Sequence, residues 1–293
     1  MDPDPALAVR TIVLPLDGLA SSERVFPFAA RLASAFRARL VLLRALGNVN
    51  PALSHDADAL ALALASHKEA HRAARAKLSE NAAELRARHL EVQIVLEDGD
   101  AAVAIHRTSD AVHADMIAMV SRPRGMVASV LLGSVADRVV QQVKVPILLV
   151  PYMAPHERWA EGRGVDVLVT LDGSKFAEAA LRPALGLAGA LGGSLLLLRV
   201  ANAHERAAAE TYLTEVARDP AGSGPSIDRQ VAVAPSASSA ILETVHARHI
   251  GVLAMATHGR GGFLRAVLGS VAGETVALTD IPVLLVRPQH SIQ

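Results

Sequence analysis

Short apolar runs alternate with amphipathic segments along the whole chain. Residues 12–16 and 167–171 form apolar runs that each lead into an Asp-Gly pair, a pattern typical of a buried strand entering a turn. Alanine-rich segments with helical spacing follow at 23–36 and 177–191. Strand-like runs then recur in the same order in both halves, at 39–46, 91–97, 115–120 and 145–150 and at 194–200, 229–235, 251–256 and 281–286. Strands that are apolar throughout and alternate with helices predict a parallel sheet covered on both faces.

The two halves are copies of one unit. Residues 129–150 align without gaps to residues 265–286, with 10 of 22 positions identical, and residues 11–18 match residues 166–173. In both copies a glutamate, Glu23 or Glu178, follows the first Asp by six residues. The offset between the copies is 155 residues at the front and 136 at the back, so the first copy carries 19 extra residues. These fall in residues 56–90, which are rich in strong helix formers.

The repeat defines the domain organisation. We expect two tandem doubly wound α/β domains, each with a five-stranded parallel sheet, over residues 11–151 and 165–288. Residues 152–164 contain proline, glycine and the single Trp and are interpreted as a linker. Residues 1–10 and 289–293 are interpreted as tails.

Composition excludes several classes of protein. The formal net charge is zero, which argues against nucleic acid as a partner, and the absence of cysteine excludes disulfides, thiolate metal sites and cysteine nucleophiles. The N-terminus is acidic and proline-broken, unlike a secretory signal, and no apolar run approaches the roughly 18–20 residues that span a bilayer. The sequence therefore predicts a cytoplasmic protein with no membrane partner.

A candidate anion site lies in the second half. In parallel α/β sheets ligands bind beyond the carboxyl ends of the strands, and Asp172, Val200 and the pair Met255-Ala256 end three of these strands. A glycine-rich loop follows Ala256, and Gly269-Ser270 stands where the next helix begins. Helix N-termini offer unpaired N–H groups to phosphate, and glycine lets the backbone approach an anion closely. The arrangement favours a nucleotide site.

A purely structural interpretation competes with this one. Ser270 can simply cap its helix, and Ser134 with Asp137 resembles a variant of the capping box. In the first half Pro123 and Met126 replace Gly259 and Gly262, and proline has no N–H to offer. Gly-Ser is thus expected to serve the fold in both halves, whereas the open loop survives in the second. A weaker second site remains in the first half at Asp17, Ala45, Gly133 and Ser134.

Other patterns in the sequence provide weaker evidence of a functional site. His67 and His71 are spaced i,i+4 and His246 and His249 i,i+3, which places each pair on one helix face, but the pattern provides no third ligand. We interpret both pairs as solvated surfaces and expect no metal site. No Walker, nucleophile-elbow or zincin motif occurs, and no paired catalytic carboxylates or nucleophile beside a base are visible. No catalytic residues are expected.

The combined motifs resemble one family. The stretches VLVTLDGS, THGRGGFLRAVLGSVA and IPVLLV, with their first-half copies, resemble the universal stress protein family in its tandem form, over nearly the whole chain. The resemblance implies a HUP fold, similar to the adenine nucleotide alpha hydrolases, with five parallel strands. Some members of the family bind ATP through a Gly-x2-Gly-x9-Gly-Ser/Thr pattern. Here that pattern falls on Ala256, Gly259, Gly269 and Ser270.

The resemblance implies roles for further residues. Thr170, Leu171 and Asp172 should line the nucleoside, Val200 should touch adenine, Met255 should lie beside the site, and Val271 should offer an N–H near the phosphates. Asp17 and Ala45 match in the first half. Ala256 replaces the first glycine of the pattern. If that position needs a positive φ, its Cβ costs about 1–2 kcal/mol, and if it is extended the cost is near zero. Arg260 and Arg265 either face the phosphates or lie on a solvated surface.

The expected function is a non-enzymatic stress-response protein that binds ATP, alone or with Mg²⁺, in its C-terminal domain as a regulatory or stabilising ligand. One alternative is slow ATP hydrolysis or adenylyl transfer, and another is an interaction module without nucleotide. LDGSKF lacks the SGGxDS-like loop of related enzymes that cleave ATP to pyrophosphate. The resemblance also implies an intramolecular pseudo-dimer in which residues 146–150 run beside residues 282–286, and it leaves a further homodimer open.

Overall fold

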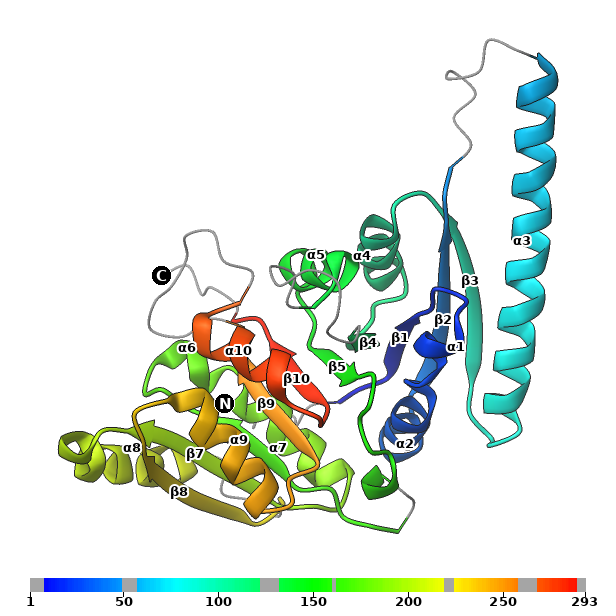
Figure 1. Ribbon diagram of the computed structural model, residues 1–293. Helices are drawn as coiled ribbons and strands as arrows, with labels where there is room; N and C mark the ends of the chain where they lie inside the picture. Colours follow the sequence, from blue (N-terminus) through cyan, green and yellow to red (C-terminus); the bar gives the residue numbers. More distant parts are fainter. Residues whose placement is uncertain are drawn as a thin grey trace.

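The computed structural model describes residues 8–48, 57–121, 132–159, 162–218, 224–257 and 268–288. Strands and helices alternate over these ranges (Figure 1). In the N-terminal half the strands are β1 (Thr11–Pro15), β2 (Arg39–Leu46), β3 (Val92–Asp98), β4 (Met116–Ser121) and β5 (Ile147–Pro151). The helices are α1 (Ala20–Glu23), α2 (Phe26–Phe36), α3 (Ala57–Arg86), α4 (Ala101–Ala111) and α5 (Ser134–Gln142).

The C-terminal half repeats this order. Its strands are β6 (Val167–Thr170), β7 (Leu195–Ala201), β8 (Ile227–Val233), β9 (Val252–Ala256) and β10 (Val283–Val286). Its helices are α6 (Lys175–Glu178), α7 (Leu181–Ala190), α8 (Arg206–Arg218), α9 (Ala237–Ala247) and α10 (Ser270–Leu278), with short 3-10 turns η2 (Glu157–Trp159) and η3 (Ala203–Glu205). The extra residues of the first half lie largely in α3, which has 30 residues where α8 has 13.

The strands of both halves join in one sheet. Within the described residues the order is β3-β2-β1-β4-β5-β10-β9-β6-β7-β8, a sheet of ten strands. All pairs inside each half are parallel, which confirms the predicted doubly wound α/β class. At the centre β5 and β10 are antiparallel, with Leu148 opposite Leu284. This pairing confirms the intramolecular pseudo-dimer, because each half covers the edge strand of the other.

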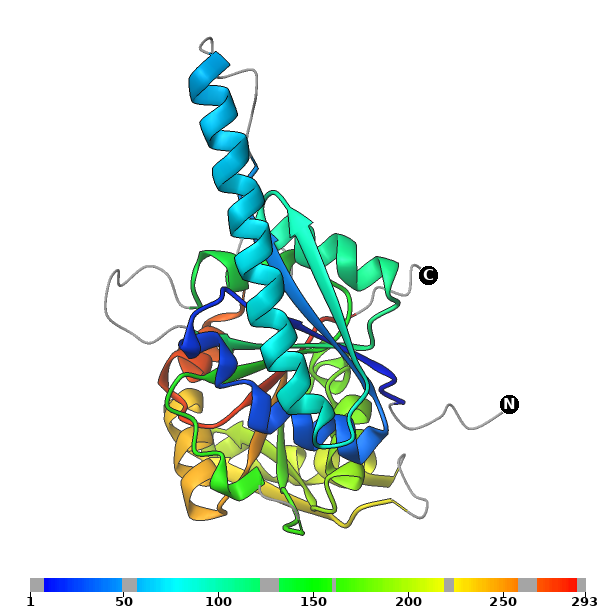
Figure 2. The same ribbon diagram turned by 90° about the vertical axis from the view of Figure 1, so that its right-hand side faces the viewer.

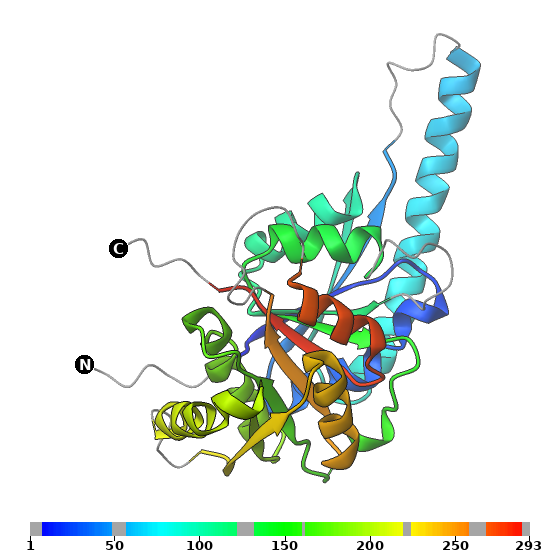
Figure 3. The ribbon, with the colours of Figure 1, turned by 60° about the vertical axis from the view of Figure 1, so that its left-hand side comes forward.

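Helices cover both faces of the sheet. One apolar cluster contains Phe28 of α2, Leu85 of α3 and Leu187 of α7, and the other contains Ile105 of α4 and Val276 of α10. The central strands carry apolar side chains on both sides because both sides are covered. Figure 3 shows α9 and α10 side by side, in agreement with their contacts. The carboxyl ends of the strands are thus left as the place where loops and helix N-termini meet.

The connecting segment is packed between the halves. Trp159 is 2% exposed, stacks edge-on against Phe28 of α2 with ring centroids 5.1 Å apart, and donates from Nε1 to the carbonyl of Gly251 at 3.3 Å. Arg158 donates to the carbonyl of Ile250 at 3.1 Å. Trp159 of the predicted linker therefore contacts both halves, and Arg158 contacts the C-terminal half.

Candidate functional site

Three strands of the C-terminal half end at the same edge. The N–H of Leu171 donates to the carbonyl of Leu198 at 2.9 Å, so strand-like pairing of β6 with β7 continues one residue past Thr170. Leu171 is buried and Thr170 is half-buried. The next residue, Asp172, is therefore delivered to the carboxyl edge of the sheet, beside the ends of β7 and β9.

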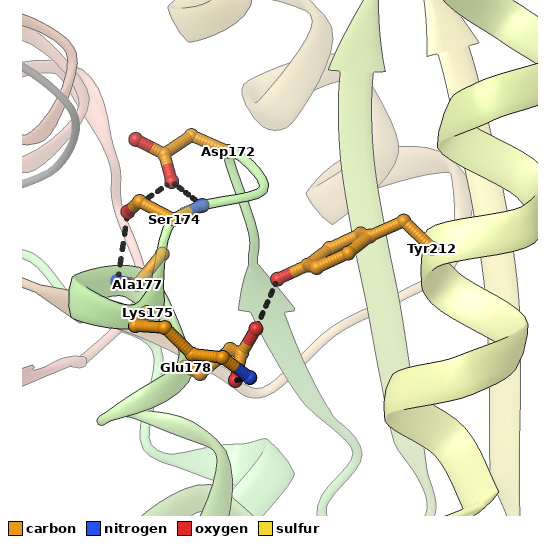
Figure 4. A network of polar contacts seen from close by, with 6 residues as sticks. All are labelled: Asp172, Ser174, Lys175, Ala177, Glu178 and Tyr212. Atoms are coloured by element: carbon orange, nitrogen blue, oxygen red, sulfur yellow. Dashed lines mark hydrogen bonds and ion pairs between the residues drawn. The ribbon is translucent and has the colours of Figure 1, made fainter.

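Asp172 is fixed by a tight turn. Gly173 has φ +88°, and the Oδ1 atom of Asp172 accepts from the N–H of Ser174 at 2.9 Å and from its hydroxyl at 2.6 Å. The hydroxyl oxygen of Ser174 in turn accepts from the N–H of Ala177 at 3.2 Å and caps α6. Figure 4 shows the other carboxylate oxygen of Asp172 directed away from this turn. The carboxylate is thereby held in one orientation without a contribution from a ligand.

A glutamate ties this turn to the outer helix. Glu178 accepts from the hydroxyl of Tyr212 on α8 at 3.2 Å and pairs with Lys175 at 2.7 Å (Figure 4). Burial, followed by the charge of Glu178, raises the pKa of the Tyr212 phenol. In the first half the equivalent Glu23 binds Lys77 at 3.0 Å and Asn81 at 3.1 Å, both on α3. The repeated glutamate thus anchors the first short helix of each half to a long one.

Ala256 has an extended backbone. It is the last residue of β9, it pairs with Val286 of β10, and it does not have a positive φ. The N–H of Thr257 also donates to the carbonyl of Val286 at 2.9 Å, so the ladder extends past Ala256. Of the two backbone conformations weighed from the sequence, the structure has the one in which the Cβ costs nothing. Met255 beside it is buried, and Val200 on β7 is half-buried.

Helix α10 begins beside the end of β9. Gly269 is its N-cap, with φ −57°, and donates its N–H to the carbonyl of Thr257 at 2.9 Å. The N-cap residue is thus a glycine, which has no side chain to cap the helix, and Ser270 does not act as the cap. Ser270 and Val271 are exposed in the first turn. The helix N-terminus therefore lies at the same sheet edge as Asp172.

The Gly-Ser pair differs between the halves. Gly133 has φ +96°, a conformation that strongly favours glycine, whereas a Cβ on Gly269 would meet the carbonyl oxygen of Thr257 at an ordinary 3.8 Å among the described residues. Gly-Ser was expected to serve the fold in both halves. The backbone requires the glycine in the first half, whereas the described residues impose no such requirement in the second. The capping box expected at Ser134 and Asp137 is absent from this described segment, because the N-cap is Gly133 and has no side chain.

The predicted site residues are largely brought together. Those within the described ranges lie at the ends of β6 and β9, near the end of β7 or in the first turn of α10: Thr170, Leu171, Asp172, Val200, Met255, Ala256, Gly269, Ser270 and Val271. Gly259, Gly262, Arg260 and Arg265 of the loop lie outside the described residues, as do Pro123 and Met126 of the first half.

The first half has a cavity at the equivalent position. It has a volume of about 470 Å³, and all four residues of the weaker predicted site line it: Asp17, Ala45, Gly133 and Ser134. This volume lies within the range of roughly 300–1,000 Å³ that is usual for small-molecule sites. Asp137 stands in the first turn of α5, where the second half has Gly273, and burial raises the pKa of its carboxyl. When ionised, this carboxylate opposes phosphate at that helix terminus.

Sequence reasoning missed Arg44, which also lines this cavity. Its Nε and Nη1 atoms are buried and have no hydrogen-bond partner among the described residues, and a Cβ on Gly18 would overlap its guanidinium. The equivalent Arg199 instead stacks on Tyr212, 4.9 Å from the ring centroid. The signal available in the sequence was a second arginine, inside the apolar part of the strand RLVLLRAL.

Comparisons with known proteins agree with this architecture. A model of the universal stress protein family matches residues 8–151 and 166–287. The structure is similar to a universal stress protein from Archaeoglobus fulgidus, with 22% identity, TM-score 0.72, and 94% of this chain and 98% of that chain covered. It is similar to a putative universal stress protein from Pseudomonas aeruginosa, with 17% identity, TM-score 0.68 and coverage of 97% and 95%. No curated protein sequence matches the chain. Searched over its described residues, the chain has no helix with the length and apolarity needed to cross a membrane.

Proposed function

The chain belongs to the universal stress protein family as a tandem of two family domains, and from this premise we propose that its C-terminal half binds ATP, alone or with Mg²⁺, as a regulatory or stabilising ligand. The observation that carries the proposal is the N-terminus of α10, which lies beside Thr257 and, in the described part of the chain, has no side-chain cap. Such a terminus offers N–H groups and partial positive charge to phosphate.

The environment of Gly269 supports the proposal. Neither its φ of −57° nor its contacts among the described residues require glycine, so close approach of a ligand is a physical reason for its presence. Ala256 does not oppose binding through strain, because its backbone is extended. Asp172, oriented by its hydrogen bonds with Ser174, lies at the same edge, where the family resemblance expects the nucleoside.

The N-terminus of a helix alone contributes too little free energy to bind a nucleotide tightly. A helix N-terminus contributes about 0.3–2 kcal/mol to the binding of an anion, whereas micromolar affinity requires about 8 kcal/mol. Most of the binding energy must therefore come from contacts with the nucleoside at Thr170–Asp172 and Val200, together with the loop that includes Gly259.

The cavity of the first half supports a second, weaker site. Its lining residues Asp17, Ala45, Gly133 and Ser134 match the C-terminal set. Asp137 is in the first turn of the adjoining helix α5, where an ionised carboxylate disfavours a chain of phosphates at the helix N-terminus. We assign to it a ligand of the same nucleoside class with fewer phosphates.

A pair of matched variants tests which half binds ATP. Ser270→Asp places a negative charge at the first turn of α10, which favours the helix but repels phosphate, so calorimetry should show a loss of ATP affinity of roughly tenfold or more. Ser134→Asp makes the same change in the first half and should leave the tighter site unaffected. Equal losses in both variants would refute the C-terminal assignment. Absence of both heat and a thermal shift at millimolar ATP would end the nucleotide proposal.

We further propose that the protein is cytoplasmic and that it binds ATP as a ligand without hydrolysing it. Prolonged incubation with labelled ATP tests for hydrolysis, and Gly259→Trp is the control variant in which the loop is blocked. Turnover by the wild-type protein well above this control would favour the alternative of a slow ATPase. Nucleotide that copurifies with the protein, identified by its mass, would name the ligand directly.

A further inference from the structure

Helix α3 is much longer than the sheet edge it covers. Its 30 residues span roughly 45 Å, whereas the seven residues of β3 span roughly 23 Å. The helix runs antiparallel to β3 and is joined to it by residues 87–91. Counting back from Arg86, the strand therefore matches about 15 helix residues and ends near His71. The N-terminal part of α3 projects beyond the sheet, as Figures 1 and 2 show.

Two histidines and an aspartate meet at the point where the helix leaves the sheet. His67 and His71 lie one turn apart on the same face of α3, with ring centroids 4.6 Å apart. Asp98, the last residue of β3, places its Oδ1 atom 3.2 Å from Nε2 of His67 and 2.6 Å from Nε2 of His71. One potential ligand atom from each residue lies within 4.8 Å of the other two. The fold thus supplies the third group that the sequence pattern lacked.

The acidic residues next to Asp98 in the sequence form ion pairs with arginines. Glu97 pairs with Arg107, and Asp100 pairs with Arg138 at 2.6 Å while it caps α4. Gly99, with φ +114°, turns the chain between Asp98 and Asp100 and separates their directions. Asp98 therefore lies at the end of β3 with its Oδ1 atom close to the two imidazoles.

From this geometry we propose that His67, His71 and Asp98 bind a divalent transition-metal ion of the Zn²⁺ class. Two imidazole nitrogens and a carboxylate oxygen suit such ions, and three protein ligands leave a fourth position for water. With ligand bonds of about 2.0–2.2 Å, tetrahedral ligand atoms lie about 3.3 Å apart, so the His67 separation already fits and the His71 separation must open by about 0.7 Å. The side chains are 22%, 31% and 47% exposed, so an ion can enter from solvent.

The bound ion would link the projecting helix α3 to the sheet. The Oδ1 atom of Asp98 lies close to both imidazoles, and a metal ion would engage the same three groups at once. Binding would join α3 to the end of β3 and restrain the helix where it loses the support of the sheet. This inference concerns the outer edge of the first half and does not depend on the proposed nucleotide function.

Calorimetric titration of Zn²⁺ into tag-free, chelator-treated full-length protein tests the proposal, with Ni²⁺ as a second probe. We expect saturable binding that weakens by at least roughly tenfold in His71→Ala and in Asp98→Asn. His106→Ala is the matched control, because His106 forms an i,i+4 pair with Asp110 at 3.7 Å on α4. This control should bind as the wild type does.

Amide hydrogen exchange provides an independent measurement. Zn²⁺ should slow exchange in the N-terminal part of α3 in the wild type and in His106→Ala, and should leave exchange unchanged in His71→Ala. Absence of Zn²⁺ and Ni²⁺ binding by the wild type, or equal binding by all variants, overturns the proposal. If Asp98→Asn does not fold, His67→Ala, which removes another of the three ligands without changing β3, gives the same comparison.

Discussion

The effect of an alanine at position 256 on ATP binding depends on its backbone conformation. In the family pattern its position is glycine, but here it is paired within β9 and extended. We predict that Ala256→Gly leaves the dissociation constant for ATP within about threefold, because no strain is relieved, and lowers stability by roughly 0.5–1 kcal/mol through backbone entropy. Calorimetry and urea denaturation measure the two effects. A tenfold gain in affinity would contradict the extended conformation as the relevant one.

Arg44 and Arg199 occupy equivalent positions and should respond oppositely to substitution. Arg44→Met removes buried, unpartnered donor atoms and should raise the free energy of unfolding by about 1 kcal/mol. Arg199→Met removes a cation stacked on Tyr212 and should lower it by about 0.5–1 kcal/mol. Urea denaturation of both variants checks the prediction. A loss of stability in Arg44→Met would mean that its guanidinium has a partner of comparable value.

Among the elements, α8 is attached to the candidate site through Tyr212. The raised pKa of its phenol means that the folded protein retains a proton that the unfolded chain releases near pH 10. This contribution to stability is complete below pH 10 and is lost as the pH rises above it. Urea denaturation between about pH 9 and 11 should therefore show a steeper fall for the wild type than for Tyr212→Phe. Parallel profiles would contradict the assigned environment of Tyr212.

At the scale of the whole molecule, Trp159 joins the two halves. It is buried against Phe28 and bonded to the carbonyl of Gly251. Trp159→Ala should cost about 3–5 kcal/mol of unfolding free energy, since it leaves a cavity at the junction. Trp159→Phe keeps most of the ring volume and should cost less. Circular dichroism follows both variants, because the single tryptophan is lost in each. Equal and small losses would show that the segment is a passive linker.

Fold and site were predictable from the sequence to different degrees. The repeat and the apolar runs located the strands, because these features are visible in the local sequence. The family resemblance supplied the β5–β10 pairing. Where the structure describes it, the C-terminal set from Thr170 to Val271 lies at one edge of the sheet, and its role in binding stays a prediction. Arg44 was missed because the burial of its donor atoms depends on Gly18 and on the turn that follows β1. The role of Trp159 was missed because its partners lie far away in the chain.

The sequence by itself determined that this protein is a repeated α/β unit with a glycine-rich loop in its second copy. The apolar pattern of each strand and the internal repeat can be read from the local sequence. Burial on both faces of the sheet imposes the apolar pattern on each strand. Tertiary structure alone decided that Ala256 is extended, that the positive φ at position 133 requires glycine, and that Asp98 meets His67 and His71. Those outcomes depend on which segments the ten-stranded sheet brings together, and no local pattern shows that residues separated by 27 positions are neighbours.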